Sequence, residues 1–346
     1  MNQPTHPDNL LALADAAIAS DQKANAAVDS TGRTVPHNWQ LARIVEELHG
    51  ARRDWRSAHS RQRETGSRDL PSRDALEQVM EQLCGALFPM RLGPADLREE
   101  SENFFVGHNL DSALNTLYAQ VRLALRHVAR STHGGVVPDQ GEVDRQATEI
   151  VSQFALGLPA MRRLLDTDVM AAYHGDPAAR SVDEVLLCYP GVSAVIHHRV
   201  AHALYRLGAP LVARVVSELS HSATGIDIHP GAQIGAAFFI DHGTGVVIGE
   251  TAIIGERVRL YQMVTLGAKR FPKTVTGDLE KGLPRHPIVE DDVVIYSGAT
   301  ILGRVIIGKG STIGGNVWLT RDVPPGSVVT QGTLKSNCPD DGSDVL

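Results

Sequence analysis

The sequence predicts an α plus β-helix fold, in which an all-helical N-terminal domain precedes a left-handed parallel β-helix of hexapeptide repeats with an inserted loop. Two periodicities lead to this prediction. Up to about residue 220, apolar residues recur every three or four positions, as in amphipathic helices. From Ile228 onward they recur every sixth position, which fits neither a helix nor an ordinary strand and is typical of a hexapeptide solenoid.

The helical domain is expected over residues 38–222. It follows an arm at residues 1–37, whose polar composition with prolines and glycine predicts disorder or loose docking. The clearest helix is a stripe of apolar residues from Leu110 to Val128. Ser181 and Glu184 have the spacing of a capping box, which marks a helix start. Other helices are expected near residues 76–87, 143–157, 160–173, 181–188 and 192–218.

The β-helix is expected over residues 223–330. Its apolar positions fall in three runs with a step of six, which extend over residues 228–246, 248–266 and 289–319. Glycines such as Gly235 and Gly249 directly follow several of these positions and permit tight corners. Three flat sides of six residues make a coil of about 18 residues. A β-sandwich with scattered Ile-Gly pairs is the rival interpretation, which such long runs disfavour.

An interruption at about residues 268–286 separates the second run from the third. Its Lys-Arg-Phe-Pro-Lys segment, Gly277, Gly282 and Pro284 predict a basic loop that leaves the solenoid at a corner. Insertions of this kind often carry the binding function of a solenoid. The last residues, 331–346, are expected to form a flexible tail.

The overall composition excludes several classes of function. The formal net charge is −7, which provides no electrostatic footprint for nucleic acid or for an anionic membrane surface. No apolar run approaches the length of about 20 residues that a membrane helix needs, and no secretory signal is visible. Three widely spaced cysteines suit free thiols in a reducing compartment, and Cys84 and Cys188 are expected in the core. A cytoplasmic protein is therefore expected.

The candidate catalytic residues of the β-helix are Asp227 and His242. These residues are 15 positions apart, so we expect them on adjacent coils near the same corner. A carboxylate there can orient the imidazole, whose other ring nitrogen can then act as a general base toward a hydroxyl nucleophile. The alternative is a corner with a side-chain-capped turn, but the accompanying Asp241 and the basic loop favour a functional site.

A metal site is the competing hypothesis for the same region. His229, His242 and His286 could supply three zinc ligands, as in β-helix enzymes of the γ-carbonic anhydrase type. Arg285 directly precedes His286, and a guanidinium beside a cation site is unfavourable. We therefore expect no metal.

Several motifs in order carry a resemblance to a known family. They are Gly175-Asp-Pro, Asp227-Ile-His-Pro-Gly-Ala-Gln-Ile-Gly, Ile240-Asp-His-Gly-Thr-Gly-Val-Val-Ile-Gly-Glu-Thr, Gln262-Met-Val-Thr-Leu-Gly, Pro284-Arg-His-Pro and Ala299-Thr-Ile-Leu-Gly. Together they span about residues 165–330 and closely resemble the active-site stretch of the serine O-acetyltransferase family. The resemblance implies transfer of an acetyl group from acetyl-CoA to the hydroxyl of L-serine, a step of cysteine biosynthesis.

The resemblance also implies roles for individual residues. It makes His242 the general base and Asp227 its partner. Residues at positions that hold the substrate serine are Asp176, Asp241, Arg285 and His286, and those where the backbone approaches acetyl-CoA are Gly267, Ala268, Ser297 and Gly315. A guanidinium such as Arg285 suits the serine carboxylate, and carboxylates suit its ammonium group. Taken alone, Asp176 would be read as an Asp-Pro turn.

Partners follow from the same resemblance. Family members form β-helix trimers with each active site between two subunits, and many pair two trimers, so a homotrimer or a dimer of trimers is expected. L-Cysteine often competes at the serine site in the family, which makes it an expected feedback inhibitor. Members that dock into O-acetylserine sulfhydrylase end in isoleucine, whereas this chain ends in Leu346, so weaker docking is expected. Homoserine or another acceptor remains the rival substrate, because one methylene changes selectivity by only about 1–3 kcal/mol.

Overall fold

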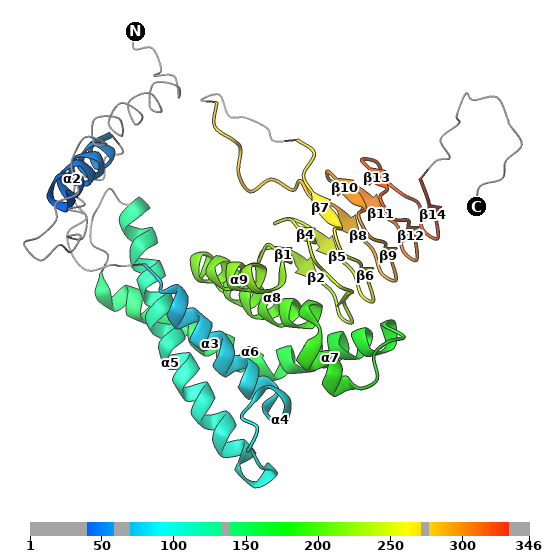
Figure 1. The fold of residues 1–346 in the computed structure, drawn as a ribbon, viewed down its shortest axis with the longest axis horizontal. Helices are drawn as coiled ribbons and strands as arrows, with labels where there is room; N and C mark the ends of the chain where they lie inside the picture. The colour runs from blue at the N-terminus through cyan, green and yellow to red at the C-terminus, as the bar shows by residue number, and fades with distance from the viewer. Residues whose placement is uncertain (1–39, 59–69, 133–138, 271–276, 332–346) are drawn as a thin grey trace, which may run out of the picture. The chain divides into compact units, whose positions relative to one another are not determined.

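The computed structural model describes residues 40–58, 70–132, 139–270 and 277–331 (Figure 1). The chain divides into two compact units, residues 1–67 and 68–346, which are described separately. The expected arm at residues 1–37 and the tail residues 332–346, including Leu346, lie outside the described residues. In the first unit, helix α2 spans Leu41–Ala58, and none of its residues is buried.

The described residues of the second unit begin with seven helices. They are α3 (Arg73–Leu87), α4 (Pro89–Leu92), α5 (Glu99–Thr132), α6 (Gln140–Gly175), α7 (Val182–Cys188), α8 (Pro190–Arg206) and α9 (Pro210–Thr224). The predicted cap is present at α7, where the Ser181 hydroxyl accepts a hydrogen bond from the Glu184 amide at 3.0 Å. The Glu184 carboxylate accepts one from the amide of Arg180 at 2.8 Å. No helix in the described ranges has the length and apolarity to cross a membrane.

Two helix boundaries differ from those expected. Residues 143–157 and 160–173 belong to one helix, α6, which continues through Pro159. The helix persists because Phe154 and Leu158 before the proline and Met161 after it are all buried on the same side. Conversely, the helix expected over residues 192–218 is broken between α8 and α9, where Gly208 adopts a φ of 94°.

The two described cysteines have different surroundings. Cys84 packs against the core, and burial together with the nearby Glu81 raises the pKa of its thiol to about 12. Cys188 was expected in the core, but it is exposed at the C-terminal end of α7. This short helix buries only Val185, so its last turn remains at the surface.

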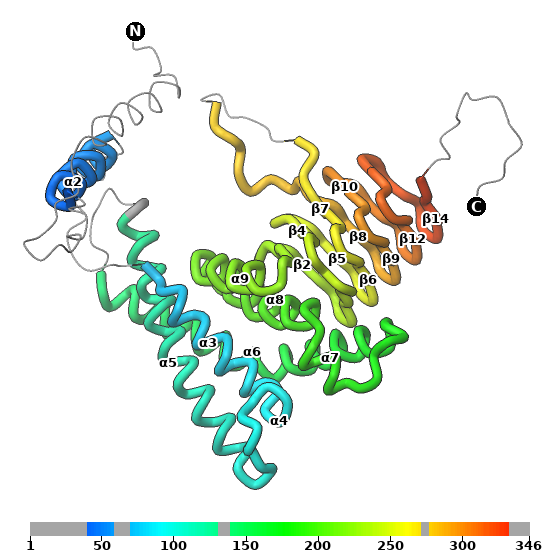
Figure 2. The backbone as a smooth tube through the Cα atoms, viewed as in Figure 1, coloured from blue at the N-terminus to red at the C-terminus, as the bar shows by residue number. Residues whose placement is uncertain are grey.

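The other described residues of the second unit form the stacked coils of a β-helix (Figure 2). Its strands are β1 (Asp227–Ile228), β2 (Gln233–Ile234), β3 (Phe239–Ile240), β4 (Val247–Ile248), β5 (Ile253–Ile254), β6 (Arg259–Leu260), β7 (Thr265–Gly267), β8 (Ile288–Val289), β9 (Val294–Ile295), β10 (Thr300–Leu302), β11 (Ile306–Ile307), β12 (Thr312–Ile313), β13 (Trp318–Leu319) and β14 (Val328–Val329). They form three sheets, ordered β1-β4-β7-β10-β13, β2-β5-β8-β11 and β3-β6-β9-β12-β14. The strand pairs are all parallel, so the fold confirms the prediction of a helical N-terminal region followed by a β-helix of hexapeptide repeats.

The strand register shows where extra residues enter the coils. Val247 pairs with Thr265, and Thr300 with Trp318, each 18 residues further along the chain. Asp227, however, pairs with Val247, 20 residues further on. Thr265 pairs with Thr300, 35 residues further on, because the inserted loop lies between them. The first coil is therefore longer than the repeat requires by two residues.

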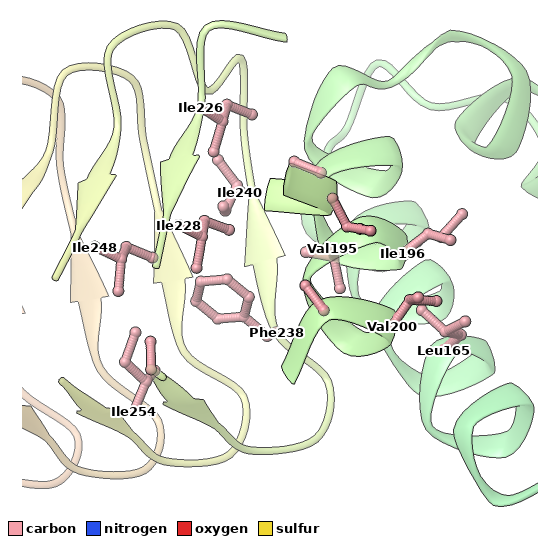
Figure 3. Packing of buried hydrophobic residues seen from close by; sticks show 14 of the residues in the cluster. Leu165, Val195, Ile196, Val200, Ile226, Ile228, Phe238, Ile240, Ile248 and Ile254 are labelled. Carbon is pink, nitrogen blue, oxygen red and sulfur yellow. The ribbon is translucent and has the colours of Figure 1, made fainter. Parts of the chain in front are cut away.

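The helices and the first coils share one core (Figure 3). Leu165 of α6 and Val195 of α8 are buried in the same cluster as Phe238 and Ile240 at the start of the β-helix. Glycine permits a close approach at this junction, because a Cβ on Gly191 would lie 2.1 Å from the Ile240 carbonyl oxygen. The start of α8 is thus held directly against β3.

A buried ion pair connects the same two parts. Arg199 of α8 binds both carboxylate oxygens of Asp168 of α6, at 3.1 and 3.0 Å. The guanidinium also donates to the carbonyl oxygens of Ile234 and Gly235 in the first coil, and Asp168 accepts a hydrogen bond from the Phe238 amide at 2.9 Å. Both side chains are at least 94% buried, with exposed fractions of 6% and 3%. The pair thus joins the two helices to the corner between β2 and β3.

Replacement of Arg199 by leucine should destabilise the folded chain by about 3–5 kcal/mol, because it leaves the Asp168 carboxylate buried without its partner. Urea unfolding would measure the effect. The matched control is Arg91→Leu, which removes the exposed ion pair with Asp183 and should cost less than about 1 kcal/mol. Equal losses in the two variants would contradict this account.

Candidate active site

The two additional residues of the first coil lie at the corner between β3 and β4. Ile240 and Ile248 both point inward, and they are separated by eight positions rather than six. His242 lies at this corner with a left-handed φ of 56°, and its side chain is 67% exposed. Gly243, with a φ of 88°, leaves no room for a side chain, since a Cβ would lie 2.4 Å from Ile226. The corner therefore presents the imidazole of His242 outward.

Two carboxylates lie close to His242. The Asp241 carboxylate is 3.7 Å from the His242 Nδ1 atom. Asp176 is the C-cap of α6, and its pKa is lowered mainly by the hydrogen bond from Tyr189 and by that from the Ala178 amide, with a smaller contribution from His242. The structure thus brings together three of the predicted site residues, Asp176, Asp241 and His242.

Asp227 begins β1, the strand that pairs with β4 directly after this corner. Its backbone amide donates to the Val246 carbonyl at 2.9 Å, so β1 is attached to the end of the His242 corner. Within the described residues, no hydrogen bond or ion pair joins the Asp227 carboxylate to His242. The Asp227 carboxylate lies within 4.8 Å of the side chains of Glu218 and His221 of α9.

Arg285 and His286 lie at a different corner, where the inserted loop returns to β8. The Arg285 guanidinium binds Glu250 at 2.7 Å, and His286 Nδ1 accepts a hydrogen bond from the Thr251 amide at 3.0 Å. Burial first, and then Arg285, lower the pKa of His286 to about 4, so the ring is neutral at pH 7. A Cβ on Gly249 would lie 2.0 Å from this ring, so glycine is required there.

The predicted site residues therefore fall on two corners of one chain. His242 and its neighbours precede β4, at the amino ends of the β1-β4-β7-β10-β13 sheet, and the loop leaves β7 at the carboxyl ends. About four extended residues separate the corners of such a flat side, a span of roughly 13 Å. A single serine molecule does not reach from one corner to the other.

The four residues expected to approach acetyl-CoA also lie at these two corners, two at each. Gly267 and Ala268 lie where the loop leaves β7, and Ser297 and Gly315 lie at the His242 corner of later coils. At Gly315 a Cβ would lie 3.2 Å from the Ser297 carbonyl oxygen, so the two residues are in close contact.

The histidines of the competing zinc hypothesis do not converge within the chain. His229 and His286 lie at the loop corner, and His242 lies at the other. Among the residues that the structure describes, the one cluster with metal-ligand spacing is Glu218, His221 and Asp227, which includes none of the three.

Sequence reasoning missed the contacts of Tyr189, Glu250 and Thr251. The Tyr189 hydroxyl donates a hydrogen bond to Asp176 at 2.5 Å, and Glu250 accepts one from Tyr205 at 3.2 Å. Glu250 and Thr251 stand inside the quoted Gly-Glu-Thr motif, which indicated the segment but no partner. Nothing in the sequence around Tyr189 indicated its role.

Comparison with known proteins defines the class of enzyme to which this fold and site belong. The family model Bacterial transferase hexapeptide (six repeats) matches residues 286–321. The part of the β-helix from β8 to β13 is thus similar to the hexapeptide repeats of bacterial transferases.

Relatives narrow this class. The chain is 56% identical over 270 residues to the plasmid serine acetyltransferase of Synechococcus elongatus, which covers 78% of this chain and 84% of that protein. It is 48% identical over 181 residues to the serine acetyltransferase of Bacillus subtilis, which covers 50% of this chain and 79% of that one. The chain belongs to the serine acetyltransferase family.

Solved structures agree with this assignment. Serine acetyltransferase 1 of Entamoeba histolytica, solved in complex with L-cysteine, superposes with a TM-score of 0.63 at 38% identity. The match covers 73% of this chain and 86% of that one. Isoform 3 of the same organism, also with cysteine, gives a TM-score of 0.59 at 35% identity and covers 76% and 84% of the two chains.

The buried state of His286 predicts a pH dependence of stability. Its pKa is about 4 in the folded chain against an ordinary value of 6.5, so between these values the unfolded chain binds more protons. The free energy of unfolding should therefore fall as the pH is lowered from about 6.5 toward 4. Urea unfolding at pH 7 and pH 5 should show a smaller fall for His286→Gln than for the native chain. Equal falls would show that His286 titrates normally.

Proposed function

We propose that this chain transfers the acetyl group of acetyl-CoA to the hydroxyl of L-serine, with His242 as the general base. The observation that supports this most directly is the lengthened first coil, which presents the His242 ring to solvent beside two carboxylates. His242 removes the hydroxyl proton, the serine oxygen attacks the thioester carbonyl, and the carbon–sulfur bond breaks. The imidazolium then protonates the departing thiolate, so O-acetyl-L-serine and CoA are the products.

Asp227 is proposed as the carboxylate that orients His242 and stabilises its protonated form. Support comes from the attachment of β1 to the end of the His242 corner, through the amide of Asp227 and the carbonyl of Val246. Asp241, whose carboxylate is 3.7 Å from Nδ1, and Asp176 are the carboxylates that the structure places close to the ring.

Serine recognition requires an anionic and a cationic group. Asp176 and Asp241 are proposed to hold the ammonium group, and Arg285 with His286 the carboxylate. Because these sets occupy two corners of one chain, the site is proposed to form between two copies in a homotrimer or a dimer of trimers. The neutral state of His286 suits a hydrogen-bonding role beside the Arg285 charge.

Acetyl-CoA is proposed to lie along the same junction, past Gly267 and Ala268 of one copy and Ser297 and Gly315 of the next. The described part of the loop adds the exposed cations Lys269 and Arg270, which suit the phosphates of CoA. No step of this mechanism calls for a metal.

The first test measures thiol release from acetyl-CoA with L-serine, and with homoserine as a rival acceptor. His242→Ala should lower kcat by at least about 100-fold, because it removes the general base. Serine should be preferred over homoserine by a factor of about 10 or more. The control is His108→Ala, an exposed histidine of α5 outside the site. Full activity of His242→Ala would require another base, and no turnover with serine would overturn the function.

L-Cysteine is proposed as a competitive inhibitor at the serine site, since it carries the same ammonium and carboxylate groups. The same assay at sub-saturating serine should show slower initial rates with added L-cysteine, and the loss should disappear at saturating serine. A rate independent of L-cysteine would contradict the proposal. Docking of the C-terminal tail to O-acetylserine sulfhydrylase stays a prediction from the sequence.

A further inference from the structure

The Tyr189 hydroxyl is hydrogen-bonded to the carboxylate of Asp176, a residue of the proposed serine site. It donates a hydrogen bond of 2.5 Å to Asp176 Oδ2, while Asp176 Oδ1 accepts one of 2.8 Å from the Ala178 amide. Both oxygens of this half-buried carboxylate are therefore held, one by the backbone and one by the side chain of a residue between α7 and α8. Bonds of this kind fix the direction in which the remaining lone pairs of the carboxylate point.

The backbone around Tyr189 is itself fixed. Tyr189 is both the C-cap of α7 and the N-cap of α8, and Pro190 follows at the first helical position. One residue further on, Gly191 lies against the Ile240 carbonyl so closely that a Cβ would come within 2.1 Å. Because Asp241 and His242 directly follow Ile240, the phenol connects Asp176 to the coil that carries the catalytic corner.

The charges around the phenol favour a neutral donor. The hydrogen bond to Asp176, together with burial and the charges of Asp176, Glu184 and Asp241, raises the pKa of Tyr189 to about 12. The hydroxyl thus remains protonated while Asp176 remains anionic, and its oxygen keeps lone pairs that can accept a bond from an ammonium group.

We propose that Tyr189 is a positioning residue for substrate recognition, which holds Asp176 in the orientation that receives the ammonium group of the acceptor amino acid. This inference rests on the proposed function. A merely structural role for Tyr189 would instead be to hold α7 and α8 together, with no preference for any part of the substrate.

Tyr189→Phe keeps the ring and removes the hydroxyl. The KM for L-serine should rise about 10-fold, as expected for the loss of a hydrogen bond to a charged group, while kcat and the KM for acetyl-CoA stay within about 2-fold. A competitor that lacks the amino group, 3-hydroxypropionate, should inhibit the variant and the native enzyme with the same Ki. Tyr118→Phe is the matched control, because this α5 tyrosine makes no hydrogen bond through its hydroxyl among the described residues.

Each outcome decides between the two roles. An unchanged KM for serine in Tyr189→Phe would overturn the inference, and so would a parallel rise in the KM for serine and the Ki of 3-hydroxypropionate, which indicates general distortion. A native enzyme that does not acetylate serine would instead overturn the proposed function. A rise confined to the ligand with an ammonium group would support the positioning role.

Discussion

The stacking of coils constrains everything else in this structure. Each coil must return its inward-facing residue to the place directly above the previous one, because the parallel ladders pair Ile228 with Ile248 and Ile248 with Leu266. Additional residues cannot enter a flat side without breaking these ladders, so they leave at the corners. The chain contains two such departures, the 20-residue first coil and the 35-residue coil with the inserted loop. The proposed chemical groups lie at these two corners, on a backbone that the ladders keep rigid.

The helical region contributes to the site as well as covering the first coil. The ion pair of Arg199 and Asp168 reaches the carbonyls of the first coil, and Gly191 lets α8 approach β3. The end of α6 is equally close, since a Cβ on Gly175 would lie 2.8 Å from Arg259 and from Phe239. Asp176 follows this glycine directly. The docking of the helices thus decides where a proposed substrate ligand meets the His242 corner.

Much of the fold could be predicted from the sequence, because apolar residues that recur every sixth position are typical of a hexapeptide β-helix. The boundaries of the helices were harder to predict, since tertiary packing decides whether a proline ends a helix. Pro159 is accommodated in α6, whose buried stripe continues on both sides, whereas Gly208 and Pro210 separate α8 from α9. The burial of Cys188 was wrong for a related reason, because α7 is too short to bury both its ends.

Candidate site residues could be predicted where they lie in a local sequence motif. Contacts between residues that only the tertiary fold brings together could not be predicted. His242 stands out because it follows Asp241 and lies 15 positions after Asp227, whereas the substrate role of Arg285 was implied by the family resemblance. Asp176 was identified by resemblance alone, since its bond to the Ala178 amide is that of an ordinary turn. Tyr189 meets Asp176 across 13 residues only after two helices have docked, and no local pattern encodes that contact.

The central claim is that the two corners act together across neighbouring copies. The most direct test mixes His242→Ala chains with Arg285→Ala chains, each inactive by itself, in one assembly and measures acetyl transfer to serine. The account predicts that activity returns, because some sites then combine an intact His242 of one copy with an intact Arg285 of the next. If mixed assemblies form and stay as inactive as the separate variants, both corners serve a site within a single chain, and the account is wrong.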